Sequence, residues 1–421
     1  MKSLRQISLS ASLLTYVALS FLSIFILIFQ TAYYSLPAVQ NVLWYPADLP
    51  GIGITEVPKS FGQHYFGDFL HVITASTRSL GETPYYPYLA SSLTIGKVFS
   101  LFPYQVSVLV FFGLFLPFFL SPILLLAKFL SSTDRVLLLI VASFNIGTLY
   151  LIDRGNIQLV VSASISLFFL FQAKQKNLIA ALCLSIGISI KLWPIIFLLP
   201  LFLIRSYKPI FIAICSAIAL NFLPLITFYA SDPRRWSYTQ SQISQTLTFS
   251  SIDSGLWHAG GKNTSLTALI YFVGQVQSFT NFRDLLLSNY ALVQYVGVFA
   301  LLIGLLRNQK SLRNQFLLVS IFVLIIPSAQ YGYSMSILIP ALCFGIYEQV
   351  AGRQSSCGNI DIPLPYHLVI LSMLPISLVL PIEQTSQWFI DLNTLLSPIF
   401  LSAAFILLIV PLRPVESYSE M

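Results

Sequence analysis

Charged residues at the borders of long apolar segments are the groups in this chain with the chemistry to act on a substrate. Asp68 opens a short segment, Arg154 lies between two apolar runs, and Lys191 stands two residues before Trp193. Placing an ionisable group at mid-membrane costs about 2.5–3.5 kcal/mol on insertion scales, so a group that persists there points to a function. A carboxylate can take the proton of an attacking hydroxyl, and cations stabilise a phosphate as its charge develops.

Each of these residues also has a purely structural interpretation. A carboxylate at the first residue of a helix serves as its cap. Arg154 can pair with the neighbouring Asp153 at the level of the lipid headgroups. Lys191 can extend toward water beside the interfacial Trp193. For His258, a structural hydrogen-bonding role fits better than proton transfer. Residue types alone leave these alternatives open.

The segment that begins at Asp68 is predicted to be an amphipathic helix that ends at Gly81. Spacings of three and four residues put its apolar side chains on one stripe and Asp68, His71 and Arg78 on a more polar face. A glycine is the residue that most often follows a helix C-terminus. We therefore expect a short surface helix that presents a carboxylate, an imidazole and a guanidinium together.

The composition requires a membrane. Of the 421 residues, 56% are hydrophobic and 9% are charged, whereas about 25% of residues are charged in soluble domains. About 20 apolar residues span the hydrocarbon core as a helix, and backbone groups in lipid must satisfy their own hydrogen bonds. The fold class is therefore an all-α, polytopic transmembrane bundle that forms a single domain over residues 1–421. About twelve spans are expected near residues 11–30, 104–127, 136–152, 157–173, 178–190, 192–204, 209–229, 289–306, 315–330, 334–349, 366–382 and 396–412.

Basic residues in the short connectors set the predicted orientation. With both termini in the cytoplasm, 13 of the 22 Lys and Arg residues but only 5 of the 15 acidic residues fall on the inner side. Topology accounts for the net charge of +7, so nucleic acid is not an expected partner. Two long loops, at 31–102 and 231–288, then lie outside the cell membrane and should carry amphipathic helices. The four cysteines show neither metal-ligand spacing nor a disulfide framework.

The orientation brings the candidate residues to one side of the membrane, because Asp68, Arg154, Lys191, Lys262 and Tyr331 all map to outer loops or outer ends of spans. A transporter or lipid flippase would instead carry polar residues along a path through the bilayer and would consist of related halves. A non-catalytic scaffold is the other alternative, and it would not need the Asp68 carboxylate.

Several short motifs, in order, resemble those of a known family. They are Gly67–Phe69 followed by Leu80–Tyr85, then Arg154–Gln158, Ile190–Pro194 and Gly261–Leu266. These segments are similar to the Asp-Phe, Gly-x-x-Pro-Tyr, Gly-Asn-x-Gln, Lys-x-x-Pro and Asn-x-Ser-Leu patterns of glycosyltransferase family 87. That family comprises polyprenol-phosphate-mannose-dependent mannosyltransferases of the GT-C superfamily. The segment Ile326–Tyr333 departs from the family pattern, since it has no His where the family often has one.

The resemblance implies an inverting transfer of a sugar, with mannose as the expected one, from a polyprenyl-phosphate donor to a hydroxyl of a lipid or glycan acceptor. The reaction would occur at the outer face of a bacterial plasma membrane, among membrane lipids and without a cofactor or metal. Asp68 would be the general base. Contacts to the donor phosphate or lipid would come from Arg154, Lys191, Arg78 and Lys262. Substrate contacts would come from His71, Asn156, Gln158, Trp193, Asn263, His258, Tyr331 and Tyr333.

Overall fold

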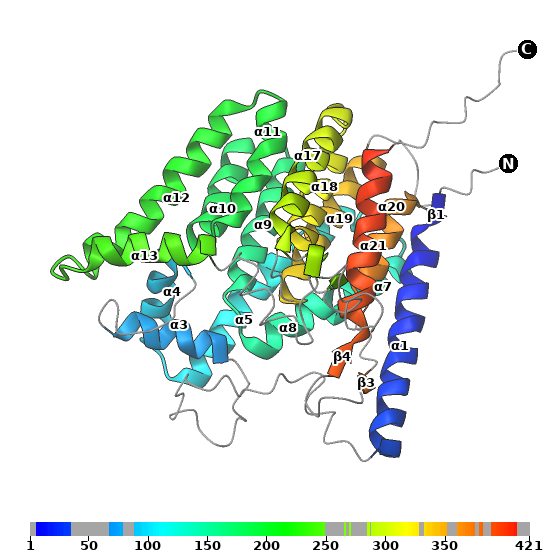
Figure 1. Ribbon diagram of the computed structural model, residues 1–421, viewed down its shortest axis with the longest axis horizontal. Coiled ribbons are helices and arrows are strands. Elements are labelled where there is room, and N and C mark those ends of the chain that lie inside the picture. The colour runs from blue at the N-terminus through cyan, green and yellow to red at the C-terminus, as the bar shows by residue number, and fades with distance from the viewer. Residues whose placement is uncertain are drawn as a thin grey trace, which may run out of the picture.

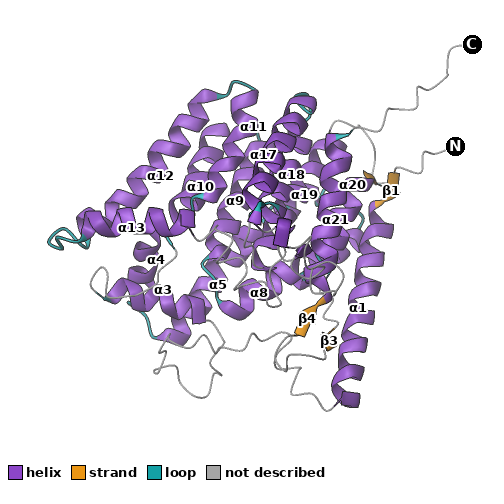
Figure 2. Ribbon diagram, in the orientation of Figure 1, coloured by secondary structure: helices purple, strands orange, loops and turns teal. Residues whose placement is uncertain are grey.

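Helices make up most of the chain that the computed structural model describes (Figure 2). The described residues are 6–34, 67–78, 88–248, 265–266, 269–270, 284–286, 288–327, 332–351, 360–374, 379–381 and 389–410. Their helices are α1 (Leu9–Tyr34), α3 (Gly67–Thr77), α4 (Ser91–Phe99), α5 (Tyr104–Leu120), α6 (Ile123–Leu126), α7 (Ser132–Phe144), α8 (Ile146–Arg154), α9 (Gln158–Ala173), α10 (Asn177–Ile190), η1 (Trp193–Phe197), α11 (Leu198–Leu203), α12 (Tyr207–Thr227), α13 (Arg235–Thr248), α17 (Tyr290–Arg307), α18 (Leu312–Ile325), η2 (Gly332–Ile337), α19 (Leu338–Ala351), α20 (Leu364–Ser372) and α21 (Leu392–Ile409).

Four described segments are long and apolar enough to cross a membrane: Tyr104–Leu126, Tyr207–Thr227, Tyr290–Arg307 and Ser334–Ala351. Shorter apolar helices of 10–17 residues cover Leu9–Ser23, Gln158–Ala173, Asn177–Ile190, Trp193–Leu203, Leu312–Ile325 and Leu396–Ile409. These helices confirm the predicted fold class, a helical membrane protein. The count of twelve spans stays a prediction.

A buried asparagine breaks the span expected at 136–152 into two helices, α7 and α8. The backbone of Asn145 is extended, with φ −76° and ψ 158°, and its Oδ1 accepts the Thr148 amide at 3.0 Å. Its Nδ2 donates to the carbonyls of Val141 at 3.0 Å and Ala142 at 2.7 Å. One side chain thus satisfies the last carbonyls of α7 and an early amide of α8, which allows the chain to turn inside the protein.

The span expected at 366–382 is also shorter than predicted. The helix α20 ends at Ser372, and the strand β3 (Val379–Pro381) pairs antiparallel with β4 (Phe389–Asp391). A second short pair joins β1 (Gln6–Ser8) to β2 (Asp361–Pro363). The all-α class therefore carries four strands of three residues each in the described chain.

Aromatic rings fill the centre of the bundle. Phe168 and Phe169 of α9 stack edge-on against Phe316 of α18, with ring centroids 5.4 and 5.0 Å apart. Small residues let the helices approach, as at Gly187 of α10, where an added Cβ would lie 2.4 Å from the Ser164 hydroxyl. The outer faces of α5, α12 and α17 expose large apolar side chains, which is what a lipid-facing surface requires.

Different helices and strands lie at the two ends of the bundle. The strand β1, the turn between α17 and α18, and the end of α21 gather at one end, the upper one in Figure 1. There Asn308 Nδ2 donates to the Leu408 carbonyl at 2.9 Å, and Arg307 Nη1 to that of Ile409 at 3.1 Å. The helices α3 and α8 lie toward the opposite end (Figure 1). Which side of the membrane each end faces stays a prediction.

Candidate functional site

The helix α3 carries the candidate base, since Asp68 is its second residue. The Asp68 side chain lies outside the described part of the structure, but the backbone beneath it is well anchored. The adjacent Phe69 is 1% exposed and packs between Phe99 and Phe111, with ring centroids 5.4 and 4.5 Å away. The predicted helix over 68–81 is thus confirmed as far as Thr77.

Two further contacts fix the orientation of α3. An added Cβ on Gly96 of α4 would lie 2.5 Å from the Val72 carbonyl oxygen, so the two helices touch backbone to backbone. Tyr229, just beyond α12, donates its phenol to the Ser76 carbonyl at 3.0 Å. Of the other predicted residues on this segment, His71 is partly buried and Arg78 is exposed directly after the helix ends.

The helix α8 ends at Arg154, and α3 lies in contact with α8. The following Gly155 adopts the left-handed conformation, with φ 56° and ψ 33°, which a glycine tolerates without steric cost. Asn156 is buried, and its Oδ1 accepts the amide of Gln158 at 2.7 Å, which starts α9. The Arg154 side chain lies outside the described part, so its contact with a phosphate stays a prediction.

The side chain of Gln158 is fully buried, and neither its Oε1 nor its Nε2 has a hydrogen-bond partner among the residues that the structure describes. A buried amide without a partner destabilises a protein by about 1–3 kcal/mol. Such a group fits a position that a polar ligand completes, and the hydroxyls of a sugar can both donate to and accept from an amide.

Lys191 stands at the C-terminus of α10, where the backbone becomes extended with φ −134° and ψ 133°. It is partly buried, and its Nζ lies 5.3 Å from the centroid of the Tyr88 ring. The carbonyl end of a helix favours a cation there. Trp193 begins η1 and packs on Phe197 with ring centroids 6.3 Å apart, so its indole has a structural contact as well.

The residues just before α4 attach to this same helix end. The Leu89 amide donates to the Ile190 carbonyl at 3.0 Å, and the Ser91 hydroxyl donates to the carbonyl of Ser189. Sequence patterns did not indicate the contact of Tyr88 with Lys191. The only local signal is that Tyr88 follows the Pro-Tyr motif of the first loop, which says nothing about a partner 103 residues further along.

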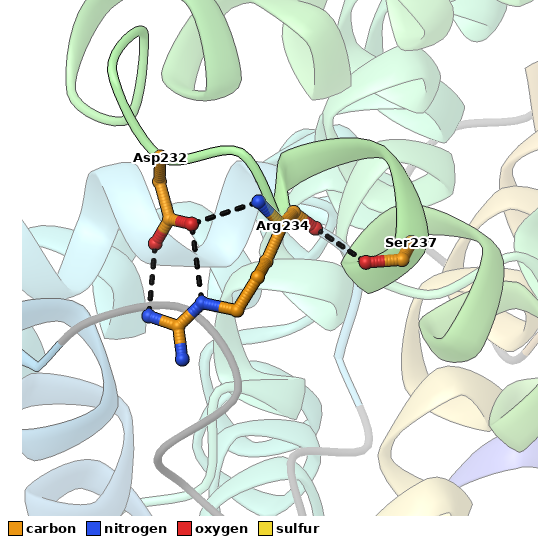
Figure 3. Close-up of polar contacts among 3 residues, drawn as sticks. All are labelled: Asp232, Arg234 and Ser237. Carbon is orange, nitrogen blue, oxygen red and sulfur yellow. Dashed lines mark hydrogen bonds and ion pairs between the residues drawn. The ribbon is translucent and has the colours of Figure 1, made fainter.

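Asp232, at the start of the second loop, serves local structure. Asp232 accepts from Arg234 through Nε and Nη2, each at 3.2 Å, and from its backbone amide at 2.9 Å (Figure 3). Ser237 donates to the Arg234 carbonyl at 2.9 Å (Figure 3). This pairing fixes the turn that leads into α13, and burial followed by the Asp232 charge raises the pKa of Tyr229, which stays neutral.

The elements that carry several candidate residues therefore meet at one end of the bundle: α3, the α8–α9 turn and the C-terminus of α10. The remaining candidates Lys262, Asn263, His258 and Tyr331, together with the side chain of Tyr333, lie outside the described residues. In the described part of the chain no group of three or more His, Cys, Asp or Glu residues forms a metal site.

Comparison with known proteins identifies a family that matches this chain. The model of glycosyltransferase family 87 matches residues 86–327, from just before α4 to the end of α18. No curated protein and no solved structure matches the chain. The matched range contains Arg154, Gln158 and Lys191, while Asp68 precedes it. Because the match covers more than half of the 421 residues, this membrane protein belongs to glycosyltransferase family 87.

Proposed function

We propose that the protein transfers mannose from a polyprenyl-phosphate donor to a hydroxyl of a lipid or glycan acceptor at the outer face of the plasma membrane. The observation that carries the proposal is the contact of α3 with α8. It puts the helix that bears Asp68 against the helix that ends at Arg154. A base and a cation must flank the reacting carbon from two sides in a displacement reaction.

In the proposed reaction the acceptor oxygen attacks the anomeric carbon of the donor sugar. Its proton passes to the Asp68 carboxylate, and the bond between that carbon and the phosphate oxygen breaks. Polyprenyl phosphate departs as an anion, which the guanidinium of Arg154 and the ammonium of Lys191 stabilise. One displacement inverts the configuration at the anomeric carbon.

The test is an assay of donor consumption by the purified protein in lipid nanodiscs. A panel of polyprenyl-phosphate sugars is supplied with a cell-envelope lipid extract as the acceptor, and release of polyprenyl phosphate is measured. We expect release from the mannose donor, dependent on the extract, and a product of inverted configuration by NMR. In parallel arms the protein receives nucleotide sugars, or is reconstituted in sealed vesicles with the donor. Consumption of a nucleotide sugar alone, or passage of an intact donor across vesicles without transfer, would refute the proposal.

Gln158 provides a second prediction. Its buried, unpartnered amide should bind a substrate hydroxyl but lower the stability of the ligand-free protein. Replacing it by methionine (Gln158→Met) should raise the melting temperature of the ligand-free protein and lower the turnover of donor about 10-fold or more, since the apolar side chain fits the buried site but cannot bond a hydroxyl. Thermal unfolding and initial rates measure the two effects.

The matched control for this change is Gln315→Met in α18. Gln315 is equally buried and its Oε1 also lacks a partner among the described residues, but its Nε2 donates to the Leu305 carbonyl at 3.2 Å, near the opposite end of the bundle. Its loss should lower the melting temperature and leave the kinetics of the folded fraction unchanged. If Gln158→Met instead lowers stability and retains full activity, the amide is structural.

A further inference from the structure

A tyrosine outside the predicted site holds one of its cations in place. Tyr88 is 6% exposed, and the Lys191 ammonium lies 5.3 Å from its ring centroid, within the range of a cation–π contact. The face of an aromatic ring attracts a cation without neutralising it. The contact with Tyr88 therefore leaves the charge of Lys191 intact.

The backbone makes this contact specific. The last carbonyls of a helix lack partners within that helix. At the end of α10, the carbonyl of Ser189 accepts from the Ser91 hydroxyl and that of Ile190 from the Leu89 amide. The Ser91 amide in turn donates to Asn221 Oδ1 of α12 at 3.2 Å. The segment Tyr88–Ser91 is thereby fixed to α10 and α12, and its tyrosine ring is set against the residue that follows α10.

The position of the lysine side chain after the end of α10 is a second reason for a role of the ring. Lys191 has left the helix, so the i to i+4 neighbours that restrict a helical lysine are missing on its C-terminal side. A lysine has four rotatable side-chain bonds and loses much rotamer entropy when it is ordered. The Tyr88 ring restricts the rotamers of Lys191 in the absence of ligand, so less rotamer entropy is lost when a ligand binds.

The same segment also links the two halves of the site. It leads directly into α4, on which α3 rests at Gly96. The helix that bears Asp68 and the end of α10 therefore share one short stretch of backbone as their support. A displacement of Tyr88–Ser91 would change the separation between the base and the cation.

We infer that Tyr88 is a positioning residue, whose ring orients the Lys191 ammonium toward the phosphate of the lipid-linked donor. The inference rests on the proposed function and adds to it the residue that sets this contact. The hydroxyl of Tyr88 has no part in the inference, so an aromatic ring of the same size should serve equally well.

The experiment compares Tyr88→Phe with Tyr88→Leu in the full-length protein. Tyr88→Phe should keep the kinetics of the unchanged protein. Tyr88→Leu should raise KM for the donor on the order of 10-fold, with a smaller change in kcat and none in KM for the acceptor. In a Lys191→Met background, Tyr88→Leu should add nothing, because the ring acts through the lysine. Tyr88→Met is a second ringless variant if Tyr88→Leu does not fold.

The control is Tyr207→Leu at the start of α12, where the tyrosine ring packs on Phe202 with centroids 5.7 Å apart. Its donor KM should not change. Equal donor KM values for Tyr88→Phe and Tyr88→Leu would overturn the inference, as would an additive effect of Tyr88→Leu in the Lys191→Met background.

A spectroscopic readout separates this failure from failure of the proposed function. Reductive methylation with ¹³C-formaldehyde labels lysine amines, and the Lys191 signal is assigned by its absence in Lys191→Arg. Ring current from Tyr88 should shift that signal upfield in the unchanged protein and in Tyr88→Phe, but not in Tyr88→Leu. An unchanged protein that consumes no polyprenyl-phosphate sugar refutes the function and with it the role of Tyr88. Activity without the upfield shift, or with the shift but without the KM effect, refutes the positioning role alone.

Discussion

Asp68→Asn is expected to reduce the rate of sugar transfer about 10²–10⁴-fold, the contribution typical of a positioned general base. Asparagine has the same shape and keeps a side-chain oxygen that can cap the first turn of α3. It cannot accept the proton of the attacking hydroxyl at neutral pH. The loss should therefore fall on kcat, while donor binding and the melting temperature stay close to those of the unchanged protein.

The control for this substitution is Asp361→Asn. Asp361 lies in β2, which pairs with β1 near the start of α1, away from α3 in Figure 1. The same chemical change there should leave the rate intact. Steady-state kinetics and thermal unfolding of both variants decide the matter: a folded Asp68→Asn protein with full transferase activity would show that the carboxylate is merely a helix cap.

The sequence predicted the helical membrane class because apolar runs of span length have few alternatives in lipid. It predicted α3 because three-and-four spacing describes a short amphipathic helix, but the helix ends at Thr77 and not at Gly81, so Arg78 lies outside it. What the structure contradicts is a continuous helix at 136–152 and at 366–382. A hydropathy pattern does not register that the side chain of Asn145 can replace helical hydrogen bonds inside a protein.

Site residues were predictable only where the residue type and its local sequence neighbours both indicate a function. Lys191 drew attention as a cation beside an apolar run and Gln158 as part of a family-like motif, and the structure puts both at helix ends. Tyr88 did not, because its role depends on a partner remote in sequence. The bond from Ser91 to Ser189 joins residues 98 positions apart, and no local pattern encodes such a pairing. The assignment of Asp68 as the base stays a prediction.

Gly96→Ala should have the second large effect, because it forces α3 away from α4. The new Cβ would lie 2.5 Å from the Val72 carbonyl oxygen and 2.6 Å from Ser76 Cβ, closer than such atoms approach in proteins. Overpacking of this kind costs about 1–3 kcal/mol. A shift of about 1 Å in a catalytic group can reduce a rate 10²-fold. Transfer activity should therefore fall by more than the loss of folded protein explains.

Gly113→Ala is the matched control, since Gly113 lies in the middle of α5 and an added Cβ meets nothing within 4 Å. Alanine is the better helix former by about 0.5–1 kcal/mol, so this variant should be at least as stable and fully active. The comparison holds the chemistry of the substitution constant and varies only what surrounds it. If Gly96→Ala lowered the melting temperature but left kcat per folded molecule unchanged, α3 would contribute to stability without positioning a catalytic group, and the base would have to be sought on another element.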